Sequence, residues 1–85
     1  MPLGRIFASV RDTLLNEWDP IGIRDVPQAK DEYDDYAAPI ARLLVEGTSV
    51  AELSRYLLEI ERDTLGLRGD PARASEVATK LLSLT

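Results

Sequence analysis

Two short stretches decide how this chain folds: residues 18–23, which read Trp-Asp-Pro-Ile-Gly-Ile, and residues 31–36, which read Asp-Glu-Tyr-Asp-Asp-Tyr. Together they hold the single Trp, two of the three Tyr and the densest negative charge of the chain. Pro20 has no backbone donor and disfavours helical geometry at the residue before it, and Gly22 can adopt a positive φ. A helix is therefore expected to end at Trp18, and the second stretch is expected to begin the next helix.

Outside these stretches the chain reads as amphipathic helices. Apolar residues recur at three- and four-residue steps, and Gly and Pro fall between the apolar runs. No stretch alternates with a two-residue period long enough to predict a strand. We therefore expect one all-α domain, a compact four-helix bundle-like fold over residues 1–85. The predicted helices cover about residues 4–18, 31–46, 49–65 and 71–84.

Two features are expected to depart from regular helices. Pro39 lies inside the second predicted helix, where it removes a backbone hydrogen bond and crowds the preceding turn, so we expect that helix to be kinked or split near Pro39. The connector at 19–30 is long compared with most links between helices. Because its aliphatic residues Ile21, Ile23 and Val26 recur along it, we expect the connector to be packed down on the core.

The sequence also marks several helix ends. Ser49 and Glu52 form a capping box, in which each side chain satisfies a free backbone N–H at the helix start. Asp70 followed by Pro71 is the expected N-cap and first position of the last helix. Gly47 is a suitable residue just past the end of the second helix.

The composition excludes most catalytic and metal-binding chemistry. There is no Cys and no His. Their absence rules out disulfides, thiolate metal sites, a Cys nucleophile and an imidazole general base. We expect no catalytic residues, no cofactor and no bound metal, and we interpret the chain as a protein that is not an enzyme.

The charge and hydropathy of the chain limit the classes of partner that it is expected to bind. The net charge of −5 and the scattered cations argue against nucleic acid and against an anionic membrane surface, and favour a basic protein partner. No apolar run reaches the roughly 20 residues that a membrane span needs. The opening residues lack the features of a signal peptide, so a cytoplasmic location is expected.

The acidic and aromatic side chains around the second stretch are the predicted binding site. Clustered aromatics and charges are typical of protein interfaces, although in a small domain Trp and Tyr more often fill the core. The leading hypothesis is a non-enzymatic module for protein–protein interaction, with this patch as the contact. The predicted site residues are Trp18, Arg24, Asp31, Glu32, Tyr33, Asp34, Asp35 and Tyr36.

Two other functions stay open at the sequence level. Asp31, Asp34 and Asp35 would share one helix face and could hold a divalent cation or a small molecule, although acids at a helix N-terminus are also what the helix dipole favours. Paired carboxylates can do acid–base chemistry when one is buried. The candidates are Asp34 or Asp35 with Asp19 or Glu61, and Glu61 lies beside the core position Ile60. A structural homodimer is the remaining alternative, with Leu15, Leu58 and Leu84 as its contact.

The two stretches also carry a resemblance to a known family. The Trp-x-Pro-Ile-Gly motif at 18–22 and the Asp-Glu-Tyr motif at 31–33 resemble those of the YugE-like family of small, uncharacterised bacterial proteins. The resemblance spans roughly residues 6–67 and implies a compact all-helical fold, a bacterial cytoplasmic origin and no established activity. This chain departs from the family in its Arg-rich composition and in Leu65, where Met is commoner. Further matching positions are Ile40, Leu43, Leu44, Ser49, Leu57, Ile60, Glu61, Gly66 and Leu67.

The size and acidity of the chain suggest a specific version of the protein-binding hypothesis. Small acidic proteins of this kind often occur as immunity proteins that neutralise secreted toxins. This is an analogy of size and charge alone, and it motivates the hypothesis of a toxin-neutralising immunity protein.

Overall fold

The structure, a computed structural model, describes residues 3–29 and 31–85, and over these residues it is all-helical and has no strand. Four α-helices carry the fold, and two of them continue without a break into a wider π-helical turn. The elements are α1 (Leu3–Thr13) with the π turn η1 (Leu14–Trp18), the short 3₁₀ turn η2 (Pro27–Ala29), α2 (Asp34–Glu46), α3 (Val50–Glu59) with the π turn η3 (Ile60–Thr64), and α4 (Pro71–Leu82).

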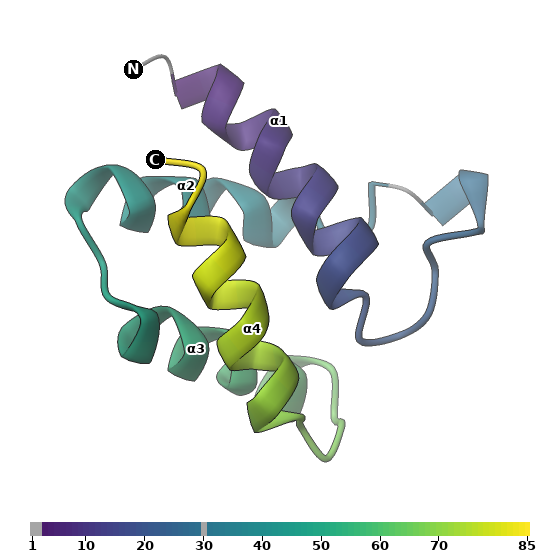
Figure 1. The fold of residues 1–85 in the computed structure, drawn as a ribbon. Coiled ribbons are helices and arrows are strands. Elements are labelled where there is room, and N and C mark those ends of the chain that lie inside the picture. The colour runs from purple at the N-terminus through teal and green to yellow at the C-terminus, as the bar shows by residue number, and fades with distance from the viewer. Residues whose placement is uncertain (1–2, 30) are drawn as a thin grey trace.

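The helices pack as two pairs around one core (Figure 1). α1 lies against α2, α3 lies against α4, and α4 also contacts α1 and η1. The molecule measures 31 × 28 × 18 Å along its principal axes. No helix of the described residues is long and apolar enough to cross a membrane. The predicted small helical bundle is therefore confirmed.

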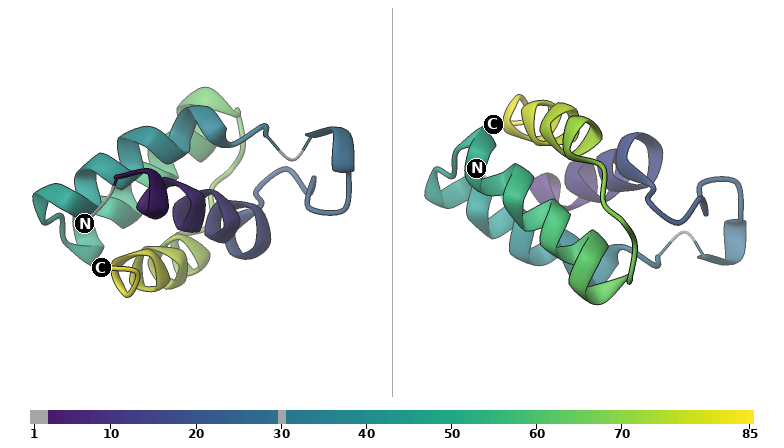
Figure 2. Two further views of the ribbon diagram at one scale, coloured as in Figure 1. Left: turned by 90° about the horizontal axis from the view of Figure 1, so that it is seen from above. Right: turned by 90° about the horizontal axis from the view of Figure 1, so that it is seen from below.

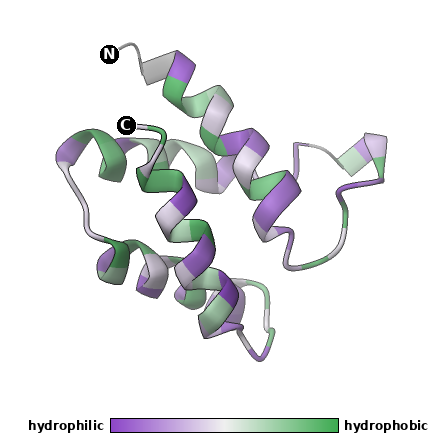
Figure 3. Ribbon diagram, in the orientation of Figure 1, coloured by the Kyte–Doolittle hydropathy of each residue, from purple (hydrophilic) through white to green (hydrophobic). Residues whose placement is uncertain are grey.

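The core forms where the apolar stripes of the helices meet. In Figure 3 the apolar positions of the four helices fall mainly on the sides that face one another. Trp18 and Tyr33 are the largest fully buried side chains, with exposed fractions of 0% and 1%. Trp18 ends η1 and Tyr33 directly precedes α2, so the two stretches that hold them supply the centre of the core and also turn the chain.

The helix boundaries agree with the predicted ones except at the second helix. α2 begins at Asp34, three residues later than predicted, because residues 31–33 form turns instead. The helix then runs without interruption through Pro39. Of the two predicted alternatives, a helix split at this residue is therefore wrong. The ring of Pro39 is exposed, and the position costs the helix one hydrogen bond without ending it.

The connector between η1 and α2 differs from the prediction. Figure 2 shows it standing away from the four helices in both views. Ile23 is half-buried against the core, as predicted, but Ile21 and Val26 are exposed. The prediction that the connector as a whole packs down on the core is therefore wrong. An alternation of aliphatic residues does not show whether a core lies beneath them.

The predicted helix ends are confirmed, with one change. The backbone N–H of Glu52 donates to Ser49 Oγ over 3.1 Å, and that of Arg73 donates to Asp70 Oδ1 over 3.1 Å. Gly47 ends α2 with a φ of 90°, which an L-residue with a side chain rarely adopts. At the capping box, the Ser49 hydroxyl donates to the Glu52 carboxylate in place of the backbone N–H.

Replacing Ser49 with Ala is expected to lower the free energy of unfolding by about 1 kcal/mol, because the first turn of α3 then loses its cap. Urea unfolding followed by far-UV circular dichroism measures the change. The control is Ser75→Ala in the exposed middle of α4, where Ala is the better helix former and no loss is expected. Equal losses in both variants would contradict the role of the cap.

Candidate functional site

The two π turns bring two distant residues together at one end of the bundle. Each turn closes with a hydrogen bond between residues five positions apart. The N–H of Asp19 donates to the Leu14 carbonyl (2.8 Å), and the N–H of Leu65 donates to the Ile60 carbonyl (2.9 Å). π turns of this kind are rare and often lie at functional sites. Here η1 ends with Trp18, and η3 carries Glu61.

Trp18 and Glu61 form a buried hydrogen bond. The indole Nε1–H donates to Glu61 Oε2 over 3.0 Å, across 43 residues of sequence. Glu61 is only 4% exposed and is the one buried charged residue among the described positions. Burying a carboxylate is costly unless its oxygens accept hydrogen bonds. Trp18 supplies one of the donors that make the burial of Glu61 tolerable.

The second donor to Glu61 comes from the linker before α4. The backbone N–H of Asp70 donates to Glu61 Oε1 over 3.0 Å. The backbone of Glu61 contributes as well, since its carbonyl accepts from Leu67 N–H at 2.7 Å. In the same linker, Gly69 has a φ of +91°, and a Cβ there would lie 2.7 Å from Nε of Arg62. Glu61 therefore fixes the entry of the chain into α4.

Asp19, the neighbour of Trp18, organises the connector. Its Oδ1 accepts the backbone N–H of Ile23 (2.7 Å), and its Oδ2 accepts that of Arg24 (3.1 Å). Asp19 is also the only described non-glycine residue with a positive φ, 34°. Asp tolerates the left-handed region better than most residues, because its short side chain can bond to nearby backbone. The chain thus reverses at Asp19 and is held by the carboxylate of the same residue.

The hydroxyl of Tyr33, which follows the connector, forms hydrogen bonds with residues at the start of the connector. It donates to Asp19 Oδ1 over 2.9 Å and accepts the backbone N–H of Ile21 at 3.3 Å. These bonds join the two ends of the connector at its base. Loops whose ends meet in this way are compact and frequently functional. We call the Asp19–Tyr33 contact the clasp, and residues 20–29 the clasped loop.

The environment of the clasp shifts the pKa of both partners. Burial tends to raise the pKa of the Asp19 carboxyl. The hydrogen bonds from Ile23 N–H, Tyr33 and Arg24 N–H outweigh burial, so the pKa of Asp19 lies below its ordinary value of 3.8. Burial raises the pKa of the Tyr33 phenol, and the bond to Asp19 raises it further. At neutral pH the clasp is thus an ionised carboxylate that accepts from a neutral phenol.

Three aromatic rings pack beside the clasp. Trp18 lies 5.4 Å from Tyr33 and 6.2 Å from Tyr36, measured between ring centroids, and Tyr33 and Tyr36 are 6.4 Å apart. These separations are in the range that favours tilted and edge-on packing. The rings fix the orientation from which Trp18 reaches Glu61 and Tyr33 reaches Asp19.

A cavity of about 230 Å³ opens between the connector and the linker before α4. It is an open depression at the surface, and it includes the two carboxylates that organise these loops. Both oxygens of Glu61 already accept hydrogen bonds there. Its lining residues are Trp18, Asp19, Pro20, Glu61, Leu67, Gly69, Asp70 and Arg73.

The structure separates the predicted site residues into a buried, a half-buried and an exposed group. Trp18 and Tyr33 belong to the core, with exposed fractions of 0% and 1%. Tyr36 and Asp34 are half-buried, and Asp34 Oδ1 lies 2.9 Å from Arg11 Nε in an ion pair. The exposed members are Arg24, Asp31, Glu32 and Asp35.

The structure also bears on the sequence-level alternatives. Within residues 3–29 and 31–85, no group of three or more acidic side chains is arranged to hold a metal ion. A cation or small-molecule site at Asp31, Asp34 and Asp35 stays a prediction. The three leucines named for a homodimer contact, Leu15, Leu58 and Leu84, pack partly against the core.

The residues that organise this region were each named at the sequence level, but the way they pair was missed. Glu61 was considered for acid–base chemistry, but its position next to Ile60 was the only signal. The helical period does place Glu61 near the core, since Glu61 lies four positions after the core residue Leu57 and so on the same face of the helix. An acid on an apolar stripe is a recognisable signal for a buried, hydrogen-bonded carboxylate. Nothing in the sequence pairs it with Trp18.

Comparisons with protein-family models, with curated proteins and with solved structures found no match. The resemblance to the YugE-like family, and the bacterial origin that it implies, therefore stay predictions.

Replacing Trp18 with Phe is expected to lower the free energy of unfolding by about 2–4 kcal/mol, because the core loses volume and buried Glu61 loses one donor. Urea unfolding measures the loss. Tyr36→Phe is the control, since it keeps the ring and changes only a hydroxyl on a half-buried residue, and a change below about 0.5 kcal/mol is expected. A loss of this small size for Trp18→Phe would show that the bond to Glu61 stabilises nothing.

Asp19→Asn tests the clasp through its pH dependence. Because the folded-state pKa of Asp19 is lowered, its ionised form stabilises the fold above about pH 5, and this contribution is lost as the pH falls through the folded-state pKa. We expect the variant to be roughly 1 kcal/mol less stable at pH 7, with the difference shrinking at pH 3. Asn still tolerates the positive φ, so backbone strain does not obscure the result.

The control for this experiment is Asp63→Asn, a change at an exposed acid on η3. It is expected to alter the stability at pH 7 by less than about 0.5 kcal/mol. A stability difference between Asp19→Asn and the unmodified protein that grows toward low pH would contradict the sign assigned to Asp19.

Proposed function

We propose that this protein is a non-enzymatic module that binds a basic protein through the clasped loop and the acidic residues at its foot. The distribution of charge carries the proposal. Residues 19–35 hold six acids and two bases, a net charge of −4, whereas the other 68 residues hold nine acids and eight bases, a net charge of −1. Nearly all of the net charge thus belongs to one segment. A local field of this kind attracts an oppositely charged partner and orients it.

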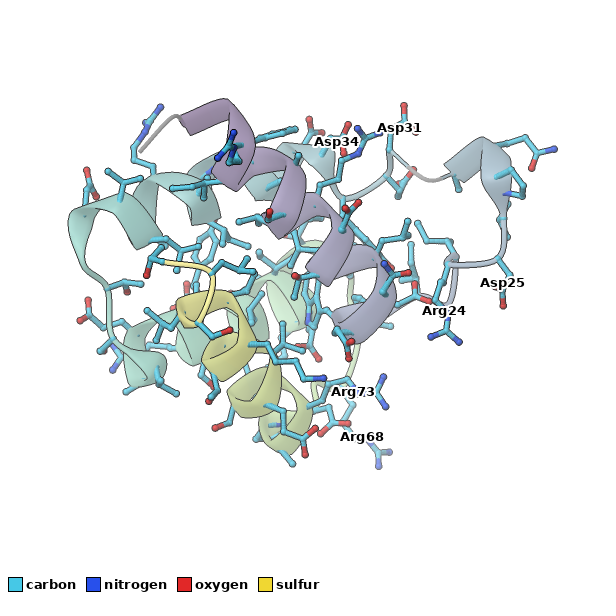
Figure 4. All side chains as sticks on the ribbon, turned by 45° about the horizontal axis from the view of Figure 1, so that its top comes forward. Arg24, Asp25, Asp31, Asp34, Arg68 and Arg73 are labelled. Atoms are coloured by element: carbon cyan, nitrogen blue, oxygen red, sulfur yellow. The ribbon has the colours of Figure 1, made fainter. Side chains whose placement is uncertain are left out.

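Four of the six acids of this segment are exposed and lie outside the ion pairs of the described residues. Among the described residues only two ion pairs form, Arg11–Asp34 and Lys80–Glu17. The exposed acids of the segment take part in neither pair: they are Asp25, Asp31, Glu32 and Asp35. In Figure 4, Asp31 and Asp34 lie on the side of the connector near the start of α2, and Arg68 and Arg73 lie on the other side of it.

The chemistry of the buried carboxylate also favours binding over catalysis. Glu61 accepts one hydrogen bond on each oxygen, from Trp18 and from the backbone of Asp70. A general base needs to reach a substrate proton, and with no His or Cys in the chain there is no second group of the usual kind to work with it. Support of Trp18 and of the linker before α4 accounts for Glu61 without a reaction.

Neutralisation of a basic toxin is the most specific form of this proposal. A small acidic domain that covers a basic surface of a toxin would need little more than a rigid contact and complementary charge. Size and charge favour this form, and the identity of the partner will decide it.

Triple charge reversal tests the proposal. Immobilised protein is used to capture partners from an extract of the source cells, the captured species are identified and purified, and their affinities are measured. Reversing Asp31, Glu32 and Asp35 to Lys is expected to weaken binding of a basic partner at least tenfold at low salt and to flatten its salt dependence. Asp34 is left unchanged because reversal there would break its ion pair with Arg11.

The control reverses three exposed acids outside the segment, Glu46, Asp63 and Glu76, and it changes the net charge by the same amount. It is expected to weaken binding far less, because its charges lie away from the contact. Equal effects of the two triple variants would show that only net charge matters. A partner with no basic surface would refute the proposal.

A further inference from the structure

We infer that the clasped loop is a preorganised binding element whose exposed Ile21 and Val26 enter an apolar depression on the basic partner, while the clasp holds the loop in its binding shape. This inference rests on the proposed function and adds the mode of recognition to it. Three observations lead to it: the loop protrudes, it is ordered by its own hydrogen bonds, and it exposes aliphatic side chains.

The loop protrudes without the support of a neighbouring helix. Figures 1 and 2 show the stretch around η2 at the greatest distance from the helices, with its two ends returning to η1 and α2. A segment in this position gains little stability from the core. It is also the part of the molecule that can reach furthest into a partner.

The loop is nevertheless held by a continuous series of hydrogen bonds. Gly22 N–H donates to the Asp19 carbonyl (3.2 Å), Val26 N–H to that of Ile23 (2.9 Å) and Ala29 N–H to that of Val26 (3.0 Å). The Asp19 carboxylate and the Tyr33 hydroxyl fix the first turn and join the two ends. Ordering a loop on binding costs affinity, and a loop that is already ordered avoids much of that cost.

The ordered loop presents apolar surface to solvent. Ile21 is 40% exposed and Val26 is 42% exposed, and they are two of the four large aliphatic residues that the described part of the chain leaves exposed. The other two, Val45 and Val50, lie on either side of the α2–α3 turn. Pro20 and Pro27 flank the exposed pair and restrict the backbone further. Covering Ile21 and Val26 would add hydrophobic stabilisation to the complex.

The charges around these side chains define the occupant. Arg24 and Asp25 lie on the loop itself and offset each other, so the excess negative charge lies at its foot, in Asp31 and Glu32. A partner that covers Ile21 and Val26 must therefore place its rim against these carboxylates. An apolar depression surrounded by Lys or Arg satisfies both requirements, since charge suits the rim of an interface and aliphatic groups suit its centre. The partner is thus a basic protein with a concave apolar patch.

Site-specific photocrosslinking tests the contact in cells. A benzophenone amino acid replaces Ile21 in one variant and Val45, the control, in another; Val45 is more exposed, at 58%, and lies outside the loop. The inference expects one discrete crosslinked species from position 21, absent from position 45, which mass spectrometry identifies as a basic protein. No crosslink at position 21, equal crosslinks at both positions, or a crosslink to a second copy of this chain would each overturn it.

Binding of the identified, purified partner then tests the side chains. Ile21→Ser and Val26→Ser are each expected to weaken the affinity about tenfold or more, whereas Val45→Ser is expected to change it less than about twofold. Because all three exchange an exposed aliphatic residue for Ser, general effects on solubility or stability would appear in the control as well. Equal affinities for Ile21→Ser and Val45→Ser overturn the inference.

Tyr33→Phe isolates the clasp. It removes the hydroxyl and keeps the buried ring, Ile21, Val26 and every charge of the loop. We expect faster trypsin cleavage after Arg24 and an affinity about tenfold weaker, because the free loop becomes disordered before binding. Tyr36→Phe is the matched control and should change neither quantity. Unchanged cleavage together with unchanged affinity in Tyr33→Phe refutes preorganisation by the clasp.

These results separate the inference from the proposed function. A basic partner that is sensitive to reversal of Asp31, Glu32 and Asp35 but insensitive to Ile21→Ser and Val26→Ser would leave the proposed function standing and refute the loop as the binding element. A loop-dependent partner with no basic surface would refute both proposals, because the inference assumes a basic rim.

Discussion

The hydrogen bond from Trp18 to Glu61 is the constraint on which the rest of the structure depends. A carboxylate that is 4% exposed has to receive donors from the protein, because water reaches it poorly. One donor is the indole of Trp18 at the end of η1, and the other is the backbone of Asp70 just before α4. The π turns η1 and η3 place the indole and the carboxylate opposite each other. The requirement of a single buried charge thus links the first helix, the third helix and the entry to the fourth.

The residue after Trp18 extends this arrangement to the surface. Trp18 belongs to the core and supports the linker before α4, whereas Asp19 holds the connector through its carboxylate and through Tyr33. Two consecutive residues therefore fix both loops at this end of the bundle. The ring of Tyr33 packs against that of Trp18, so the conformation of the connector is coupled to the packing of the core. A protruding loop can remain ordered in this fold because its base is part of the core.

The sequence predicts the architecture well because helices are local structures. Apolar periodicity, the caps at Ser49 and Asp70 and the glycine at 47 each act within a few residues, and all of them are observed. α2 is not split at Pro39, because an otherwise regular helix tolerates one missing hydrogen bond when the proline ring faces solvent. Local rules predict that this proline destabilises the helix. Whether the helix still forms depends on how the whole of α2 packs.

The candidate site was only partly predictable, because it depends on contacts between distant residues. The acids at 31–35 were identified, and those outside the Arg11 ion pair are exposed. Trp18 and Tyr33 were assigned to the surface patch because aromatic composition alone does not distinguish an interface from a core. The bond between residues 18 and 61 and the clasp between residues 19 and 33 have no local signature. The exposure of Ile21 and Val26 likewise depends on where the connector runs, which no periodicity describes.

Hydrogen exchange at the indole N–H of Trp18 tests the central claim most directly. The chain has one Trp, so its Nε1–H gives a single side-chain resonance in a two-dimensional NMR spectrum. If this proton is buried and bonded to Glu61, it should exchange only when the protein unfolds globally, as slowly as the most protected backbone amides of α2 and α3. Exchange at the rate of free tryptophan would contradict the account, because Glu61 would then lack the donor on which its burial and both loops depend.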